Sequence, residues 1–182
     1  MLFSRQRFDA RSLMPIIANV FQVAAHAGQQ RKFSGLPYHT HPQAVAELLK
    51  QNVANATPDM EVAAYLHDVL EDTAVTYDLL AEQFGEDVAK MVDGLTNKKV
   101  SGMNRAEQKR HDAICMSQQP WEVRVIKLCD RLHNLPDIIA NDPSHAKVYV
   151  PETRFLLDTA LRGVHDILWC KLDAICNQYT YK

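Results

Sequence analysis

Apolar residues recur every three or four positions along most of this 182-residue chain, and this helical periodicity constrains the fold more than any other feature. No segment alternates apolar and polar residues as a half-buried β-strand does. The predicted helices are 12–26, 42–49, one that opens at Thr57 and Pro58 and contains 65–73, then 77–84, 86–92, 105–116, 121–135 and 153–179. The pattern predicts an all-α helical bundle, and the absence of repeats and linkers predicts one domain over residues 1–182.

The composition argues against several classes of protein. With 47% hydrophobic residues the chain is long enough to bury a core, and a net charge of −2 gives no overall attraction to nucleic acid or to an acidic membrane. No stretch reaches the length of a membrane span or of a signal peptide's apolar segment. We therefore expect a cytoplasmic protein with neither nucleic acid nor a membrane as a partner.

The cysteines point to the same compartment. The chain has four, without CxxC spacing, and Cys115 and Cys129 lie inside apolar helical patterns. We expect these two to be buried free thiols in a reducing compartment, not halves of disulfides.

The segment YLHDVLEDT, residues 65–73, carries a histidine and three acids on an otherwise apolar helix. His67 and Glu71 are spaced i and i+4, and so are Asp68 and Asp72, so both pairs are expected on one face. A divalent ion held by His67 and Asp68 would compensate this crowding. Glu71 and Asp72 would then be placed to take or return a proton. The alternative is a solvated acidic helix end.

A second charged group lies in VRVIKLCDRLHNL, residues 123–135, where apolar side chains nearly surround the helix. Lys127, Asp130 and Asn134 share one stripe of this helix. A buried carboxylate needs a partner, which is either an internal ion pair with Lys127 or Arg131 or a metal ion with Asp130 as ligand.

The segment YHTHP adds two histidines, and His41 is the better candidate ligand because it stands at a helix start directly after a basic loop. With His67, Asp68 and Asp130 it gives two imidazoles and two carboxylates from three helices. Such a set suits a first-row divalent ion with open positions, and the lack of thiolate ligands argues against a structural zinc site. The site is predicted to be hydrolytic.

Three blocks of the sequence, AAHAGQQRKFSGLPYHTHPQAVAELL, YLHDVLEDT and VIKLCDRLHNL, resemble in the same order the HD-type (p)ppGpp hydrolase domain of RelA/SpoT homologues. The resemblance runs from about residue 20 to 135 and implies an all-α HD fold of the stand-alone small alarmone hydrolase type. It implies one Mn²⁺ ion, with ligands His41, His67, Asp68 and Asp130 and with Glu71 and Asp72 as the catalytic pair.

The resemblance also implies contacts to the nucleotide. Arg31, Lys32 and Ser34 match the family's RKxSG loop, which faces the guanine base and phosphates, and a guanidinium such as that of Arg31 can stack on a base or fork onto phosphate. Asn134 matches an asparagine near the ribose. Ser34 has the alternative of serving only as a turn residue.

Further cations lie on the predicted helix 105–116. Arg105, Lys109 and Arg110 match a helix that in relatives offers positive charge to the phosphates, and a solvated basic face is the alternative. Beyond Pro136 the match fades. Tyr149 lies in the region where family members place a tyrosine against the nucleotide.

The implied reaction removes the 3′-pyrophosphate of ppGpp or pppGpp and gives GDP or GTP plus pyrophosphate. Two alternatives remain open at this point. One is the same chemistry on another nucleotide, such as the 2′-phosphate of NADPH or a nucleoside monophosphate, with release of orthophosphate. The other is a catalytically silent nucleotide-binding sensor, against which the presence of both Glu71 and Asp72 counts.

Overall fold

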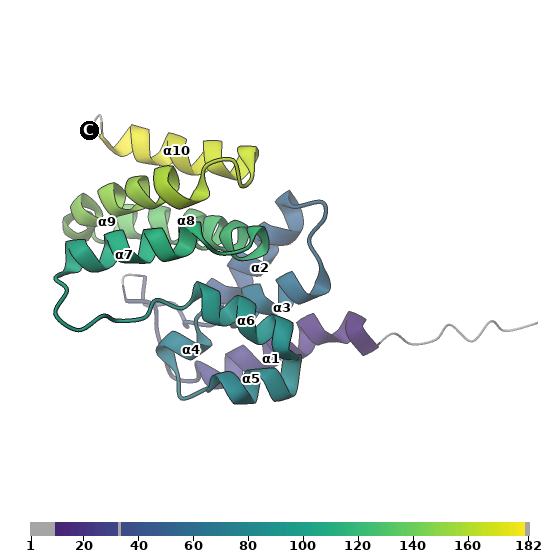
Figure 1. The fold of residues 1–182 in the computed structure, drawn as a ribbon. Helices are drawn as coiled ribbons and strands as arrows, with labels where there is room; N and C mark the ends of the chain where they lie inside the picture. The colour runs from purple at the N-terminus through teal and green to yellow at the C-terminus, as the bar shows by residue number, and fades with distance from the viewer. Residues whose placement is uncertain (1–9, 33, 181–182) are drawn as a thin grey trace, which may run out of the picture.

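The computed structural model describes residues 10–32 and 34–180, and within these ranges the chain folds into helices joined by turns (Figure 1). A lone bridge between Gln30 and Pro37 is the only β-type pairing in the described part. The helices are α1 (Met14–Ala25), α2 (Thr40–Asn52), α3 (Pro58–Leu66), α4 (Val69–Asp72), α5 (Tyr77–Phe84), α6 (Glu86–Leu95), α7 (Arg105–Ser117), α8 (Trp121–Asn141), α9 (Pro143–Leu156) and α10 (Asp166–Thr180), with a 3-10 turn at Ala10–Leu13 and a π turn at Leu157–Leu161. The prediction of an all-α fold is confirmed.

Local chemistry explains several of the helix starts. The Thr57 hydroxyl accepts a hydrogen bond from the Met60 amide at 3.2 Å, directly before Pro58 opens α3. Asn104 and Glu107 form a reciprocal capping box at the start of α7. Gly85, with a φ of 91°, separates α5 from α6 as the sequence predicts.

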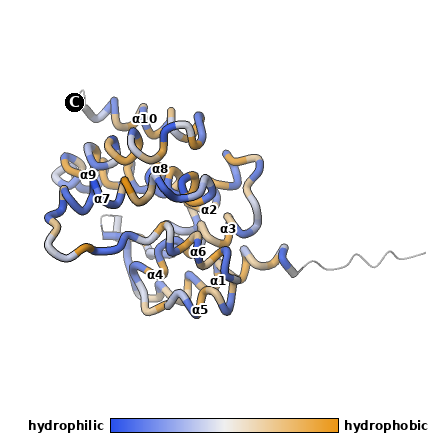
Figure 2. The backbone as a smooth tube through the Cα atoms, viewed as in Figure 1, coloured by the Kyte–Doolittle hydropathy of each residue, from blue (hydrophilic) through white to orange (hydrophobic). Residues whose placement is uncertain are grey.

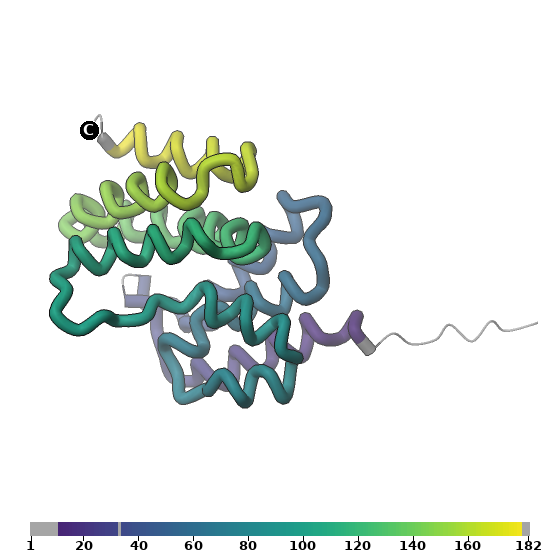
Figure 3. Tube along the Cα trace, in the orientation of Figure 1, coloured from purple at the N-terminus to yellow at the C-terminus, as the bar shows by residue number. Residues whose placement is uncertain are grey.

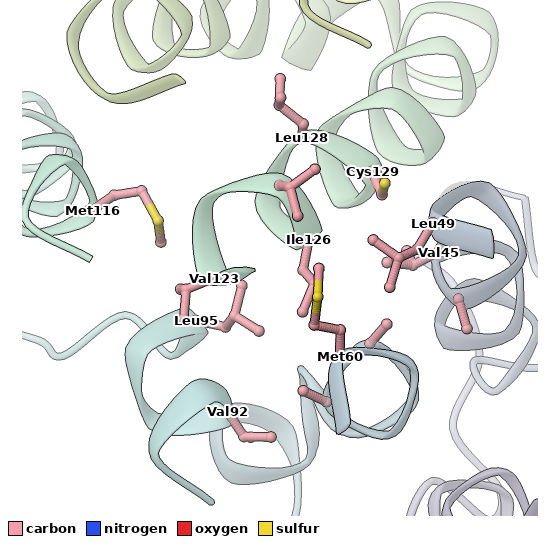
Figure 4. Packing of buried hydrophobic residues seen from close by; sticks show 14 of the residues in the cluster. Val45, Leu49, Met60, Val92, Leu95, Met116, Val123, Ile126, Leu128 and Cys129 are labelled. Carbon is pink, nitrogen blue, oxygen red and sulfur yellow. The ribbon is translucent and has the colours of Figure 1, made fainter. Parts of the chain in front are cut away.

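Helix α8 is the central element, since it packs against α2, α3, α6, α9 and α10. Figure 3 shows α1 and α5 at one end of the molecule and α10 at the other. In the core, side chains of α2, α3, α6 and α8 point toward one another, with Met60 of α3 close to Ile126 of α8 (Figure 4). Leu49, Met60, Ile126 and Leu128 are fully buried there.

Hydrophobic and hydrophilic positions alternate along most helices (Figure 2). Helix α1 forms as predicted, but several of its bulky apolar residues face outward: Ile16 is 61% and Val20 66% exposed, whereas Ala18 and Gln22 are buried and Phe21 packs against the core. A small residue such as Ala18 lets α1 approach α3 closely, and this contact decides which face is covered. No helix in the described part of the chain combines the length and the apolar character that a bilayer span requires.

Three predicted helices differ from the observed ones. The helix through 65–73 breaks at His67 and Asp68, between α3 and α4. The predicted helix 121–135 continues past Pro136 to Asn141 as α8. The single predicted helix over 153–179 is wrong, because the chain leaves helical geometry between the π turn and α10, where Gly163 has a φ of 71°.

The thiols divide into two exposed and two buried. None of the four cysteines is in a disulfide, which the sequence analysis expected of Cys115 and Cys129. Cys129 is buried, and burial raises the pKa of its thiol to about 12. The expectation that Cys115 is buried is wrong, because α7 turns Ala113 and Met116 toward the core and leaves Cys115 exposed.

A core substitution tests this packing. Leu49→Ala removes a fully buried side chain and is expected to lower the free energy of unfolding by about 3 kcal/mol, measured by urea denaturation with EDTA present. Val20→Ala, at an exposed position of α1, is the control and should change it by less than about 0.5 kcal/mol. Equal losses in both variants would contradict the assignment of the core.

Candidate metal centre

The four predicted metal ligands come from three regions of the chain that tertiary packing brings together. His41 lies in the first turn of α2, and Asp130 lies in the middle of α8. His67 and Asp68 occupy the break between α3 and α4, where the Asp68 backbone has φ −103° and ψ −6°. This break changes the chain direction at the two residues that the sequence analysis placed on one continuous helix.

The ligand atoms converge on one point. The Nε2 atoms of His41 and His67 lie 3.2 Å apart. Asp68 Oδ2 lies 3.4 Å from the Nε2 atom of His41 and 3.0 Å from that of His67. Asp130 Oδ1 lies 3.3 Å from the Nε2 atom of His41 and 3.9 Å from that of His67. His41, His67 and Asp130 each offer one possible ligand atom, and these three atoms lie within 4.8 Å of one another. All three residues are buried. The structure therefore brings the four predicted ligands together.

The orientation of both imidazoles fits a divalent metal ion. His67 Nδ1 lies 2.9 Å from the Ala64 carbonyl, and His41 Nδ1 lies 2.8 Å from His133 Nδ1, so both Nε2 atoms face the cluster. Two nitrogen and two carboxylate lone pairs directed at one point repel one another unless a metal ion or a proton lies between them. Two nitrogens and two oxygens suit a first-row divalent ion. Hydrogen bonds at the opposite ring nitrogen orient such ligands in metal sites.

Asp130 forms the internal ion pair with Lys127 that the sequence analysis left open, and its role as a metal ligand stays a prediction. Its Oδ2 forms an ion pair with Lys127 Nζ at 2.8 Å, while its Oδ1 faces His41 and accepts a hydrogen bond from Asn134 Nδ2 at 2.5 Å. Burial by itself raises the pKa of Asp130, but Lys127 and His41 outweigh it and hold that pKa well below its usual range. The carboxylate is therefore ionised and available as a ligand.

The two predicted catalytic acids lie on different sides of α4. Asp72 Oδ2 accepts a hydrogen bond from the Tyr38 hydroxyl at 2.8 Å, and the same hydroxyl lies 2.7 Å from Asp68 Oδ2. Glu71 Oε2 accepts hydrogen bonds from the Asn97 amide at 3.1 Å and from its side chain at 3.2 Å. Asp72 is thus linked to the ligand Asp68, and Glu71 is held by the loop between α6 and α7.

Two residues of this site were missed by the sequence analysis. Burial, followed by the charge of Asp68, raises the pKa of Tyr38, so its hydroxyl stays protonated and bridges Asp68 and Asp72. Burial lowers the pKa of His133 to about 4, so a neutral imidazole supports His41. The only available signal was their position inside the same short blocks as His41 and Asp130.

The predicted nucleotide residues Arg31, Lys32 and Asn134 line one hollow of about 140 Å³. The Arg31 guanidinium donates to Asp137 at 2.7 Å and to Asn134 Oδ1 at 2.9 Å, so the loop is fastened to α8. The hydroxyl of Ser34 is buried without a hydrogen-bond partner among the described residues. Arg31, Lys32 and Asn134 therefore lie together, whereas Ser34 does not line the hollow. Tyr38 lines it as well and connects it with the predicted ligand Asp68.

The cations of α7 face a separate groove, and Lys109 also lines a small cavity with Asn97 and Lys127, the partners of Glu71 and Asp130. Arg105 pairs with Glu152 of α9 at 2.7 Å, and Lys109 pairs with Asp112 at 3.0 Å. With Arg110 they line a groove between α7 and α9 that shares no residue with the hollow at Arg31. The structure does not bring these three into the ligand cluster.

Comparison with known sequences identifies the family. A sequence model described as HD domain matches residues 18–155. The chain belongs to the HD domain family. The α10 helix of this HD protein follows the matched region and packs on α8 and α9.

Curated relatives of the HD chain are much longer proteins. It is 41% identical over 135 residues to a Mycobacterium leprae protein named probable GTP pyrophosphokinase, covering 71% of this chain and 17% of the relative. It is 37% identical over 141 residues to a Synechocystis protein named probable guanosine-3′,5′-bis(diphosphate) 3′-pyrophosphohydrolase, covering 74% and 18%. The chain therefore spans less than a fifth of the length of either relative.

A solved structure matches almost the whole HD chain. A metazoan orthologue of SpoT, which hydrolyses ppGpp, superimposes with a TM-score of 0.83 at 27% identity and covers 95% of this chain and 97% of its own. The fold is therefore shared across nearly the full length of both proteins.

Protonation of His67 predicts how metal affinity depends on pH. Burial alone lowers the pKa of His67, but Asp68 and Asp130 outweigh it and raise that pKa to about 9 in the metal-free protein. A divalent metal ion must therefore displace this proton, so metal affinity should rise by about tenfold per pH unit from about pH 6 to about pH 9. Chelator competition measures it, with His39→Gln, a neighbouring histidine outside the cluster, as the control that should behave like the parent.

The same pKa has the opposite effect on the metal-free fold. Because the folded pKa of about 9 lies above the usual 6.5, the folded state binds more protons between these values. The stabilisation is complete below about pH 6.5 and is lost as the pH rises through about 9. Urea denaturation with EDTA checks it, and stability that increases over this window would contradict the assignment.

Proposed function

We propose that this protein is a Mn²⁺-dependent hydrolase that removes the 3′-pyrophosphate of ppGpp or pppGpp and releases GDP or GTP and pyrophosphate. The observation that carries the proposal is the convergence of His41, His67, Asp68 and Asp130 beside an acidic pair, Glu71 and Asp72. The ppGpp-hydrolysing activity of the metazoan structure and the name of the Synechocystis relative support the choice of substrate.

The metal would be held by the four converging side chains. When bound, Mn²⁺ supplies a Lewis acid that polarises a phosphoryl oxygen and makes water easier to ionise. Asp130 contributes a carboxylate kept ionised by Lys127, and Asn134 fixes the orientation of that carboxylate.

Proton movement is assigned to the acids on α4. Water adds to the phosphorus on the 3′ oxygen, the bond between that oxygen and phosphorus breaks, and the water's proton must reach a base. Asp72 is oriented by the Tyr38 hydroxyl, and Glu71 by Asn97, so each has a fixed carboxylate that can take this proton and return it to the 3′ oxygen. Because the pKa of Tyr38 is raised, first by burial, its hydroxyl acts as a donor and not as the base.

The hollow beside Tyr38 is proposed to hold the nucleoside and its phosphates. Arg31 and Lys32 supply positive charge, and Asn134 supplies a polar contact. Ser34 does not line this hollow, so its predicted contact to the nucleotide gains no support here. Arg105 and Lys109, held by Glu152 and Asp112, are proposed to act on the anionic substrate through longer-range attraction.

The protein is placed in the cytoplasm by this proposal. Its four cysteines suit a reducing compartment, because none of them is in a disulfide and Cys129 and Cys176 are buried.

Two substitutions separate metal binding from proton transfer. Asp68→Ala should abolish turnover of ppGpp together with Mn²⁺ binding, because it removes a ligand. Glu71→Gln should retain Mn²⁺ but lose activity by about 10²- to 10⁴-fold, because the amide cannot accept the proton. Anion-exchange analysis of the products and chelator competition measure the two properties.

The matched control is Glu82→Gln, an exposed acid of α5, which should match the parent. Full activity of Glu71→Gln would overturn the role assigned to Glu71. Release of orthophosphate in place of pyrophosphate, from NADPH or a nucleoside monophosphate, would select a different substrate for the same centre. Tight ppGpp binding without turnover in the Mn²⁺-loaded protein would select a silent sensor.

A further inference from the structure

A groove of about 450 Å³ lies between α7 and α9, two helices that pack side by side (Figure 1). This volume lies within the range of sites that bind small molecules. The lining residues are Arg105, Ala106, Lys109, Arg110, Lys147, Val148, Pro151, Glu152 and Phe155. None of the metal ligands is among them.

The floor of this α7–α9 groove is apolar. Val148, Pro151 and Phe155 are spaced i, i+3 and i+7 and form one stripe along α9, with Ala106 opposite on α7. Val148 is 46% and Phe155 41% exposed, although α9 has a separate buried face. Exposed apolar side chains that line a concave surface with a charged rim are typical of ligand sites.

The rim of the α7–α9 groove carries an excess of positive charge. Arg105 is paired with Glu152, and Lys109 with Asp112. Arg110 on α7 and Lys147 on α9 line the same groove from opposite walls, and neither forms an ion pair with a described residue. An anionic group between the two walls would neutralise both.

The apolar lining of the groove indicates which chemical group of a ligand would lie on the floor. None of the nine lining residues carries an amide or hydroxyl side chain, and the charged side chains belong to the rim. The floor of Ala106, Val148, Pro151 and Phe155 therefore offers no side-chain group that could hydrogen-bond a nucleobase or a sugar. A surface of aliphatic side chains and one phenyl ring suits a plain hydrocarbon chain, whose burial is not directional.

We propose that the α7–α9 groove binds a single-chain amphiphilic anion, with its alkyl or acyl chain along Val148, Pro151 and Phe155 and its phosphate or carboxylate head between Arg110 and Lys147. This inference does not depend on the proposed hydrolase reaction, because the binding measurement needs neither metal nor nucleotide.

Isothermal titration calorimetry with dodecyl phosphate, kept below its micelle-forming concentration, tests the proposal on the full chain. Saturable binding of one molecule per chain is expected. Inorganic phosphate tests the head alone, and neutral dodecyl maltoside tests the chain alone. Both should bind at least about tenfold more weakly, because each lacks half of the interaction.

Variants locate the binding. Val148→Asp, which places a carboxylate on the floor, and Lys147→Glu, which reverses one rim charge, should each weaken dodecyl phosphate by about tenfold or more. Val20→Asp on α1 and Lys90→Glu on α6 make the same changes at exposed positions elsewhere and should bind like the parent. Circular dichroism and thermal melting confirm that each variant is folded.

Several results would overturn the proposal. The first is that dodecyl phosphate shows no saturable binding. The second is that inorganic phosphate binds as tightly as dodecyl phosphate. The third is that the groove variants and the control variants lose equal affinity for dodecyl phosphate. A shift of Val148→Asp to a smaller species in size-exclusion chromatography would mean that a second copy of the chain covers the groove, which also overturns it.

Discussion

The buried carboxylate of Asp130 is the constraint around which the site is organised. A charge in the interior must be compensated, and here Lys127 neutralises one oxygen while His41 and Asn134 face the other. Because Asp130 stands at the middle of α8, the helix that packs against five others, its position is fixed by the core. Asn134 in turn binds Arg31, so the loop before α2 takes its position from the same carboxylate.

The break between α3 and α4 supplies the other half of the cluster. It turns His67 and Asp68 inward and leaves Glu71 and Asp72 on the short helix that follows. A continuous helix would have presented all four on one surface. With the break, His67 and Asp68 face the other ligands, while Asn97 and Tyr38 hold the two acids separately. In the proposed mechanism, the break would therefore supply two of the metal ligands and α4 the groups that transfer protons.

Positive charge is distributed over two separate surfaces. Arg31 and Lys32 face the hollow next to the predicted metal ligands, whereas Arg110 and Lys147 face the groove between α7 and α9. The two surfaces differ in their other groups, since the first contains Asn134 and a tyrosine hydroxyl and the second has an aliphatic floor. The net charge of −2 reveals neither, because local clusters cancel in the sum.

The sequence by itself determined the all-α class, most helix positions and all four candidate ligands, because apolar periodicity and charged residues in apolar helices are local signals. Which face of a helix is covered depends on its neighbours, so the outward Ile16 and the exposed Cys115 were decided only by tertiary packing. The break near Gly163 was missed because helical periodicity continues across it. Tyr38 and His133 join the site only through contacts between segments distant in sequence, which no local pattern encodes.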